Sequence, residues 1–139
     1  MITLNPDNPK HAEALRRLRE ETIIWLTTVT ASGQPQSTPL WFLWDGEEFL
    51  IYGSKDGPKT RNIERNPRVS LHLEGNGRGG ANVIFEGTAQ VDADAPLADA
   101  FPAYLDKYLS LITQTWSLDA FAEDYPHLIR VTPARARIW

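Results

Sequence analysis

The chain has 139 residues, no cysteine, and 14 Lys and Arg against 18 Asp and Glu, which gives a formal net charge of −4 at pH 7. This length fits one domain over residues 1–139, and the acidic balance argues against a general nucleic-acid or membrane partner. The absence of cysteine excludes disulfides, thiolate zinc sites and a cysteine nucleophile. No run approaches the ~20 apolar residues of a membrane span and the first residues lack a signal-peptide pattern, so we expect a cytoplasmic protein.

The first half of the chain predicts one helix followed by antiparallel strands. Residues 10–20 place apolar and charged side chains on opposite sides at helical spacing. Residues 22–30 are rich in β-branched side chains, and residues 36–44 follow them after a turn, so both segments predict strands. The dipeptide 45–46, Asp-Gly, is typical of a hairpin, and residues 48–53 predict the returning strand.

The following segments predict a short helix and three more strands. Residues 58–65 form the helix, which should end at 66–67, Asn-Pro, because a residue before proline avoids the helical region. Residues 68–74 alternate apolar and polar side chains, as a half-buried strand does. Residues 82–91 and 128–139 predict the last two strands.

The region between these two strands predicts helices. Asp94 is the expected N-cap of a helix over residues 95–112, which Pro102 should kink or split. Ser117 is expected to cap a second, shorter helix. The whole set predicts a mainly β, α+β domain, in which six mostly antiparallel strands form a small barrel with peripheral helices.

A basic segment lies between the third strand and the short helix. It contains Ser54, Lys55, Lys59, Arg61 and Asn62 within an otherwise acidic protein. Cations beside the free N–H groups of a helix start make an anion site, for which phosphate is the usual ligand. The alternative is a solvated turn leading into a helix.

Other motifs predict little chemistry of their own. Residues 75–80 match the dinucleotide pattern G-x-G-x-x-G, but a strand follows them instead of a helix, so they predict a hairpin loop. Arg78 at its tip could reach an anion on a neighbouring subunit. His11, His72 and His127 show no metal-ligand spacing, and no nucleophilic triad can be singled out. We therefore assign no metal ligand and no catalytic side chain.

This scarcity of catalytic side chains favours a cofactor that carries its own redox chemistry. Ser37 and Thr38 offer hydrogen-bonding groups beside the apolar Pro39 and Trp41, as a tricyclic ring would require. The alternative is an ordinary strand with an exposed polar edge.

The order of these segments resembles the pyridoxamine 5'-phosphate oxidase-like split-barrel superfamily, in particular its flavin/deazaflavin oxidoreductase B branch and a subgroup described as F420-dependent enzymes. The resemblance covers residues 12–139. It is carried by residues 26–41, 50–54, 59–63, 66–71, 104–108 and 129–133.

This resemblance implies a homodimeric split barrel with two cofactor sites at the subunit interface. Lys59, Arg61 and Asn62 would hold the cofactor phosphate, with Ser54 and Lys55 beside them. The remaining implied contacts line the ring or close the site from the partner subunit: Thr28, Ser37, Thr38, Pro39 and Trp41 for the ring, and Arg78, Tyr104, Tyr108 and Trp116 for the closure.

The expected function is that of an oxidoreductase which uses F420 to transfer hydride to a small organic acceptor. FMN is the alternative cofactor, in an oxidoreductase or flavin reductase. The sequence is also compatible with a flavin- or haem-binding module without turnover, and with a purely structural dimer. The chain lacks the Arg-Leu-Ala-Pro terminus and the substrate-binding Arg and His pair of the true pyridoxamine phosphate oxidases, which argues against vitamin B6 oxidation.

Overall fold

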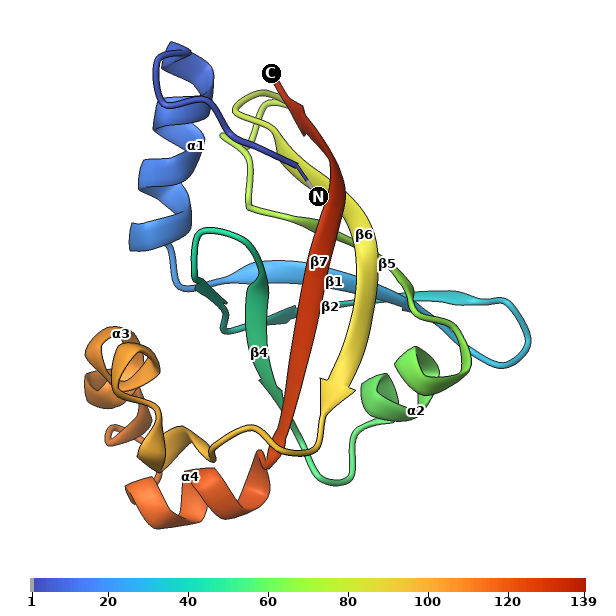
Figure 1. The fold of residues 1–139 in the computed structure, drawn as a ribbon, viewed down its shortest axis with the longest axis vertical. Helices are drawn as coiled ribbons and strands as arrows, with labels where there is room; N and C mark the ends of the chain where they lie inside the picture. Colours follow the sequence, from blue (N-terminus) through green and yellow to red (C-terminus); the bar gives the residue numbers. More distant parts are fainter. Residues whose placement is uncertain (1) are drawn as a thin grey trace.

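Residues 2–139, described in a computed structural model, form one curled antiparallel sheet with helices around it (Figure 1). The sheet has seven strands in the order β2-β1-β5-β6-β7-β4-β3. The strands are β1 (Ile24–Val29), β2 (Pro35–Leu40), β3 (Leu43–Trp44), β4 (Phe49–Gly53), β5 (Arg68–His72), β6 (Val83–Asp92) and β7 (His127–Ile138). The helices are α1 (Pro9–Glu20), α2 (Pro58–Arg65), α3 (Pro102–Ile112), α4 (Leu118–Asp124) and the 3₁₀ helix η1 (Ala98–Ala100). This architecture confirms the predicted antiparallel α+β barrel class.

The prediction of six strands was wrong because residues 36–44 form two strands instead of one. β2 and β3 lie at opposite edges of the sheet, so the chain must cross between them. The crossing is the corner Trp41–Phe42, which belongs to no strand. At this corner the backbone N–H of Phe42 donates a hydrogen bond of 2.8 Å to the hydroxyl of Tyr108 in α3 instead of joining a ladder.

The long strands β6 and β7 pair along their whole length and contain a bulge between Glu86 and Gly87. A Cβ atom at position 87 would lie 2.2 Å from the carbonyl oxygen of Thr132 on the facing strand. Only glycine allows the two backbones to come this close at the bulge, where the strand bends.

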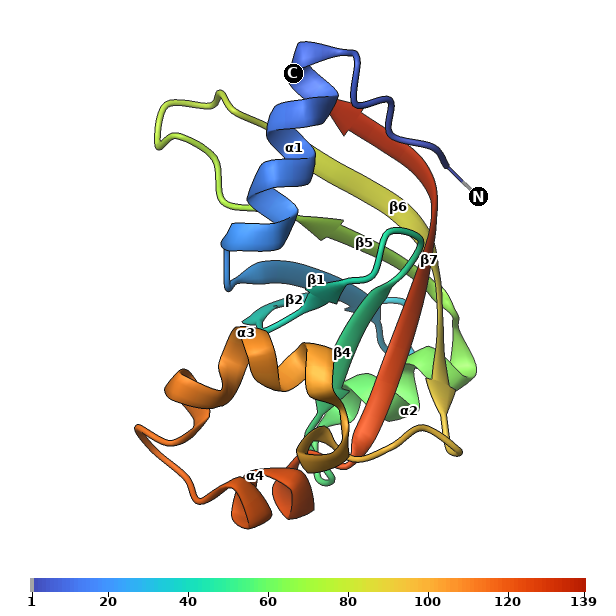
Figure 2. The ribbon, with the colours of Figure 1, turned by 60° about the vertical axis from the view of Figure 1, so that its left-hand side comes forward.

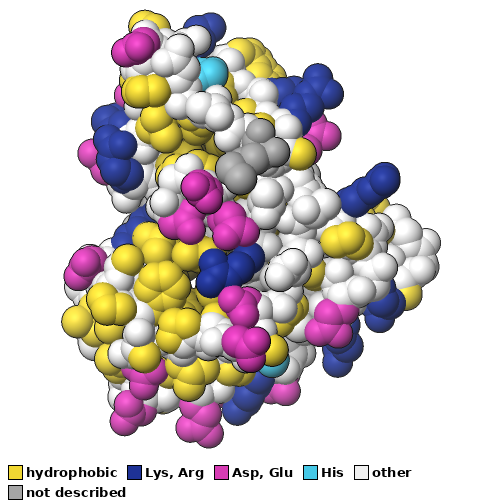
Figure 3. All heavy atoms as spheres, in the orientation of Figure 1, with side chains coloured by type: hydrophobic (Ala, Val, Ile, Leu, Met, Phe, Trp, Pro, Cys, Tyr) yellow, Lys and Arg dark blue, Asp and Glu magenta, His cyan; other side chains and the backbone are white. Residues whose placement is uncertain are grey.

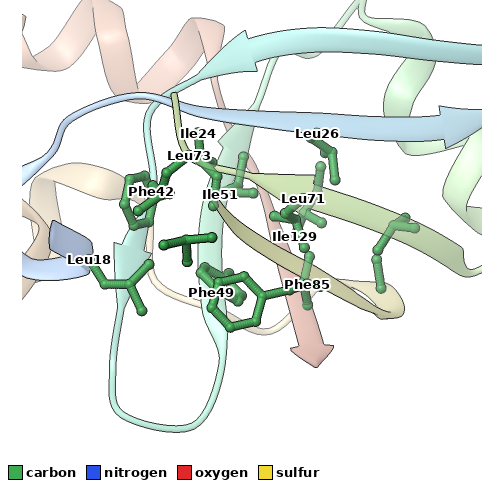
Figure 4. Packing of buried hydrophobic residues seen from close by; sticks show 14 of the residues in the cluster. Leu18, Ile24, Leu26, Phe42, Phe49, Ile51, Leu71, Leu73, Phe85 and Ile129 are labelled. Carbon is green, nitrogen blue, oxygen red and sulfur yellow. The ribbon is translucent and has the colours of Figure 1, made fainter. Parts of the chain in front are cut away.

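The first of two hydrophobic clusters fills the inside of the curled sheet. Figure 4 shows Leu26, Leu71 and Phe85 from the sheet pointing into it. Phe49 packs edge-on against Phe85 with ring centroids 4.9 Å apart, and Leu18 of α1 closes one end of the cluster. Each such side chain contributes about 1.5–3 kcal/mol when fully buried.

The second cluster lies between β4 and the helices α3 and α4. Tyr104 and Tyr108 of α3 and Phe121 of α4 pack there against Leu50 and Tyr52. Figure 2 shows α1 at one end of the sheet and the α3–α4 pair at the other. In Figure 3, apolar side chains gather over the part of the surface where Figure 1 places α3.

The helical region after β6 differs from its prediction. No helix begins after Asp94, whose backbone N–H instead donates to the carboxylate of Asp92 at 3.0 Å. The chain first forms η1, and α3 starts only at Pro102, which occupies its first turn. A proline is tolerated there because the first-turn N–H groups have no partner within the helix. The prediction that Pro102 would split the helix is thus confirmed.

The remaining element predictions hold. α2 has the predicted bounds, and Ser117 caps α4 by accepting a hydrogen bond from the backbone N–H of Ala120 at 3.1 Å. The glycine-rich segment 75–80 joins β5 to β6 as a hairpin loop. Within the described part of the chain, every helix is too short or too polar to cross a bilayer.

Candidate functional site

A cavity of about 340 Å³ opens where the ends of β2 and β4 meet the helices α2, α3 and α4. The sheet contributes one side, namely Pro39, Leu40, Trp41, Tyr52, Gly53 and Ser54. The helical side consists of Lys59, Tyr104, Trp116, Phe121 and Tyr125. A larger groove of about 410 Å³ lies between α1 and the end of β7, but no predicted site residue lines it.

One wall of this cavity is made of aromatic rings held by their neighbours. The Trp41 ring lies 5.0 Å from Tyr108, 5.7 Å from Phe121 and 6.1 Å from Trp116, measured between ring centroids. Trp116 stands nearly perpendicular to Trp41, at 87°. Edge-to-face and offset pairs of this kind fix ring orientations. The cavity therefore presents a rigid apolar wall to a flat ligand.

Among the described residues, Lys59 is the one lysine or arginine that lines the cavity. It is half-buried, and this burial lowers the pKa of its amino group. No carboxylate of residues 2–139 lies within 4 Å of its nitrogen, whereas the neighbouring Lys55 pairs with Asp124 at 3.4 Å. A half-buried cation without a counter-ion is a candidate partner for an anionic ligand.

The start of α2 adds backbone donors beside Lys59. Its N-cap is Gly57, which has no side chain to accept from the first-turn N–H groups, and Pro58 follows as the first helical residue. Ser54 lines the cavity next to this turn, and its hydroxyl accepts a hydrogen bond from the Asp56 N–H at 3.3 Å. Free N–H groups at a helix start and a nearby lysine are the standard components of a phosphate site.

Asn62 and Thr28, two predicted cofactor contacts, form a buried pair instead of lining the cavity. Both are 2% exposed, and the Asn62 amide donates to the Thr28 hydroxyl at 3.1 Å. The side-chain carbonyl oxygen of Asn62 accepts a hydrogen bond from the Arg65 guanidinium at 2.9 Å. This pair ties α2 to β1 and so positions Lys59. Arg61 is exposed on the same helix, without an ion pair among the described residues.

The other predicted contacts are scattered. Ser37 lies on β2 with its hydroxyl 2.6 Å from that of Thr27, and Thr38 is half-buried one residue further along; neither lines the cavity. Tyr108 is 0% exposed in the core behind Trp41. Arg78 is exposed in the loop between β5 and β6 and does not line the cavity. The structure thus brings together Pro39, Trp41, Ser54 and Lys59 of the predicted set. Tyr104 and Trp116, which were expected from the partner subunit, line the same cavity from this chain.

Sequence analysis missed several lining residues, notably Tyr52, Phe121 and Tyr125. Tyr52 donates its hydroxyl to the carbonyl oxygen of Pro96 at 2.7 Å, and burial raises its pKa to about 12. The periodicity of β4 gave no signal for it, because all five residues of that strand are buried. Phe121 and Tyr125 reach the cavity only through the packing of α4, which no local motif predicts.

Comparison with known proteins identifies the family of this chain. Residues 10–139 match the family model of pyridoxamine 5'-phosphate oxidase. The chain belongs to the pyridoxamine 5'-phosphate oxidase family. The resemblance inferred from the sequence is therefore confirmed at the level of the family and its split-barrel fold.

Solved structures of this fold are similar over most of their length. An F420 reductase is 24% identical with a TM-score of 0.68, covering 88% of this chain and 94% of that one. A conserved hypothetical protein of Mycobacterium tuberculosis is 25% identical with a TM-score of 0.71, covering 92% and 82%. The haem storage protein HutZ of Vibrio cholerae is 20% identical with a TM-score of 0.63, covering 99% and 95%.

Proposed function

We propose that this member of the pyridoxamine 5'-phosphate oxidase family is an oxidoreductase that binds a phosphorylated flavin-type cofactor, with F420 favoured, and reduces a small organic acceptor. The observation that carries the proposal is Lys59, a half-buried cation without a counter-ion, facing an aromatic wall in one cavity. A phosphate group needs the cation as its binding partner, and a tricyclic ring needs the aromatic wall.

The residues present fit such a group. Lys59 and the uncapped start of α2 would hold the phosphate, with Arg61 beside them on the same helix. Trp41 and Trp116 would orient the ring and exclude water from one of its faces. When bound, the cofactor supplies hydride transfer, while orientation by the protein lowers the barrier without an acid or base side chain.

A proton for the acceptor can come from solvent or from a tyrosine in the cavity. The hydroxyl groups of Tyr104 and Tyr125 make no hydrogen bond within residues 2–139 and remain available. Burial raises the pKa of Tyr104, so this hydroxyl keeps its proton at neutral pH. Tyr108 is unsuitable as a donor because its hydroxyl is engaged with the backbone of Phe42.

F420 is favoured over FMN by the subgroup resemblance of the sequence, and the F420 reductase of the same fold supports this choice. FMN remains the alternative because it presents the same phosphate and tricycle. No histidine lines the cavity, which disfavours a haem-binding role through a histidine ligand.

We propose in addition that two copies associate through the outer face of the sheet. Along β1, buried side chains alternate with half-buried ones, and the half-buried set includes Trp25 and Val29. Trp25 stacks on His72 of β5, and Ile84 of β6 stands opposite His72 in register. This half-buried row with its apolar side chains suits a second copy of the chain. Sedimentation of wild type and Ser70→Arg, a change on the same face, should show a dimer and a monomer respectively.

Titration with F420 and with FMN tests the cofactor proposal, read by quenching of tryptophan fluorescence. The double variant Lys59→Glu/Arg61→Glu should lose affinity by about tenfold or more for whichever cofactor binds wild type. Lys10→Glu in α1 is the control for net charge and should bind as wild type does. Unchanged binding by the double variant would refute the phosphate site, and binding of neither cofactor by wild type would refute the proposed function.

A further inference from the structure

Lys107 of α3 lies where three separate parts of the fold meet. Its ammonium nitrogen donates to the carbonyl oxygen of Phe42 at 3.0 Å and to that of Leu18 at 3.3 Å. The same nitrogen stands 3.9 Å from the centroid of the Phe42 ring. One side chain therefore joins α3 to the end of α1 and to the corner between β2 and β3.

Within residues 2–139, neither of these carbonyl groups accepts a hydrogen bond from a backbone N–H of a helix or a sheet. Leu18 is in the last turn of α1, where the final four carbonyl groups have no N–H within the helix. A cation there also interacts favourably with the helix dipole. Phe42 lies outside every strand, so its carbonyl has no ladder to join. The face of its ring adds a cation–π attraction that requires the charged form of the lysine.

The Phe42 corner, residues Trp41 and Phe42, forms part of one wall of the cavity. Trp41 precedes Phe42, lines the cavity, and stacks on the ring of Tyr108, the residue after Lys107. Tyr104, one turn earlier in α3, lines the cavity as well. The distance between the corner and α3 therefore sets the distance between Trp41 and the helical side of the cavity.

We propose that Lys107 is a positioning residue of the cavity, whose ammonium group holds the Phe42 corner against α3 and α1 and thereby fixes the Trp41 ring in the ligand-facing wall. Its effect on ligand binding rests on the proposed function. Its effect on the Trp41 environment does not, because that follows from the protein alone.

Charged groups near Lys107 come from the end of α1 and from α3. Glu21, beyond the end of α1, favours the ammonium form, and Arg19 of α1 and Asp106 of α3 line the same shallow cleft. The segment that faces Lys107 from the sheet consists of Phe42, Leu43 and Trp44, which carry no charge. Tyr108 stays neutral because burial raises its pKa. Burial lowers the pKa of Lys107 to about 8, so the ammonium form still predominates at pH 7.

Near-ultraviolet circular dichroism of the ligand-free protein at pH 7 tests the proposal in wild type, Lys107→Arg and Lys107→Met. The variant Trp41→Phe identifies the part of the spectrum that comes from Trp41. We expect the Trp41 signal to be high in wild type and in Lys107→Arg, which keeps a charged donor at this position, and low in Lys107→Met. A Trp41 signal that is equally high in Lys107→Met, or equally low in Lys107→Arg, would overturn the proposal.

Cofactor titration of the same proteins gives the second readout. Lys107→Met should bind the cofactor about threefold to tenfold more weakly at pH 7, and Lys107→Arg should restore the affinity. If wild type binds neither F420 nor FMN, the proposed function fails while the dichroism still decides the role of Lys107. If wild type binds and Lys107→Met binds equally well at pH 7, the positioning role is overturned while the proposed function stands.

Discussion

The hydroxyl group of Tyr108 makes the hydrogen bonds to the backbone of Phe42 that a neighbouring strand would make in a sheet. It accepts from the Phe42 N–H at 2.8 Å and lies 2.6 Å from the Phe42 carbonyl oxygen. A third contact, 2.9 Å to the carbonyl oxygen of Thr22, extends this link to the start of β1. Because the corner leaves the sheet at Phe42, α3 must satisfy its polar groups, and the split between β2 and β3 depends on α3.

Tyr108→Phe should therefore destabilise the fold. It leaves the buried N–H of Phe42 without a partner, which costs about 1–3 kcal/mol of the free energy of unfolding. Urea denaturation at pH 7 measures this cost. Tyr104→Phe is the matched control, since the Tyr104 hydroxyl makes no hydrogen bond among the described residues and its ring is equally buried. Equal stability of the two variants would contradict the role of Tyr108.

Asn62→Ala should reduce stability, whereas Arg61→Ala should leave it nearly unchanged. The first change removes the buried amide that bonds Thr28 and Arg65, at a cost of about 1–3 kcal/mol. The second removes an exposed side chain, so an effect within about 0.5 kcal/mol is expected. Thermal unfolding of both variants checks the stabilities. Cofactor titration should show that Arg61→Ala weakens cofactor binding even though this variant is as stable as wild type.

Gly87→Ala should be severely destabilising, because its Cβ atom would overlap the carbonyl oxygen of Thr132 across the bulge. The strands must separate to admit it, and we expect a loss of about 3 kcal/mol or more, or no folded protein. Gly57→Ala is the control, since a Cβ atom there meets Ser54 only at an ordinary contact distance of 3.5 Å. Comparable stability of the two variants by thermal unfolding would show that the bulge can relax.

Lys107 should make stability depend on pH in a definite direction. The pKa of its amino group is about 8 in the folded protein against the ordinary value of 10.5. Between these values the unfolded chain binds a proton that the folded chain has lost, so the free energy of unfolding rises with pH. Urea denaturation should therefore show wild type gaining stability relative to Lys107→Met from pH 8 to pH 10.5. A relative loss over this interval would contradict burial as the cause of the lowered pKa.

Local patterns predicted most elements of this fold for reasons that lie within a few residues. Pro58 and the Asn66-Pro67 pair bound α2 because proline is accepted in the first turn of a helix and restricts the residue before it. Ser117 caps α4 through its own hydroxyl. The predicted anion site also rests on neighbours in the chain, Lys59 and the start of α2, and it stays a prediction.

Local patterns failed where a distant residue supplies the partner. Nothing between residues 36 and 44 indicates that the strand breaks at Phe42, because the group that satisfies its backbone is Tyr108, 66 residues away. The family resemblance implied Asn62 as a phosphate contact, and this role stays a prediction; in the structure its amide donates to Thr28. An amide bonds whichever polar group the packing offers, and sequence spacing does not show which one that is.

The amino-acid sequence by itself determined the strand pattern, the helix ends and the cation beside a helix start, because these follow from backbone preferences and charge over short distances. Only the tertiary structure decided which aromatic rings face the cavity and which fill the core. Trp41 and Tyr108 share one stack, but only Trp41 is at its open side. That difference depends on how α3 docks against the corner, which is set by hydrogen bonds and packing between segments far apart in the chain.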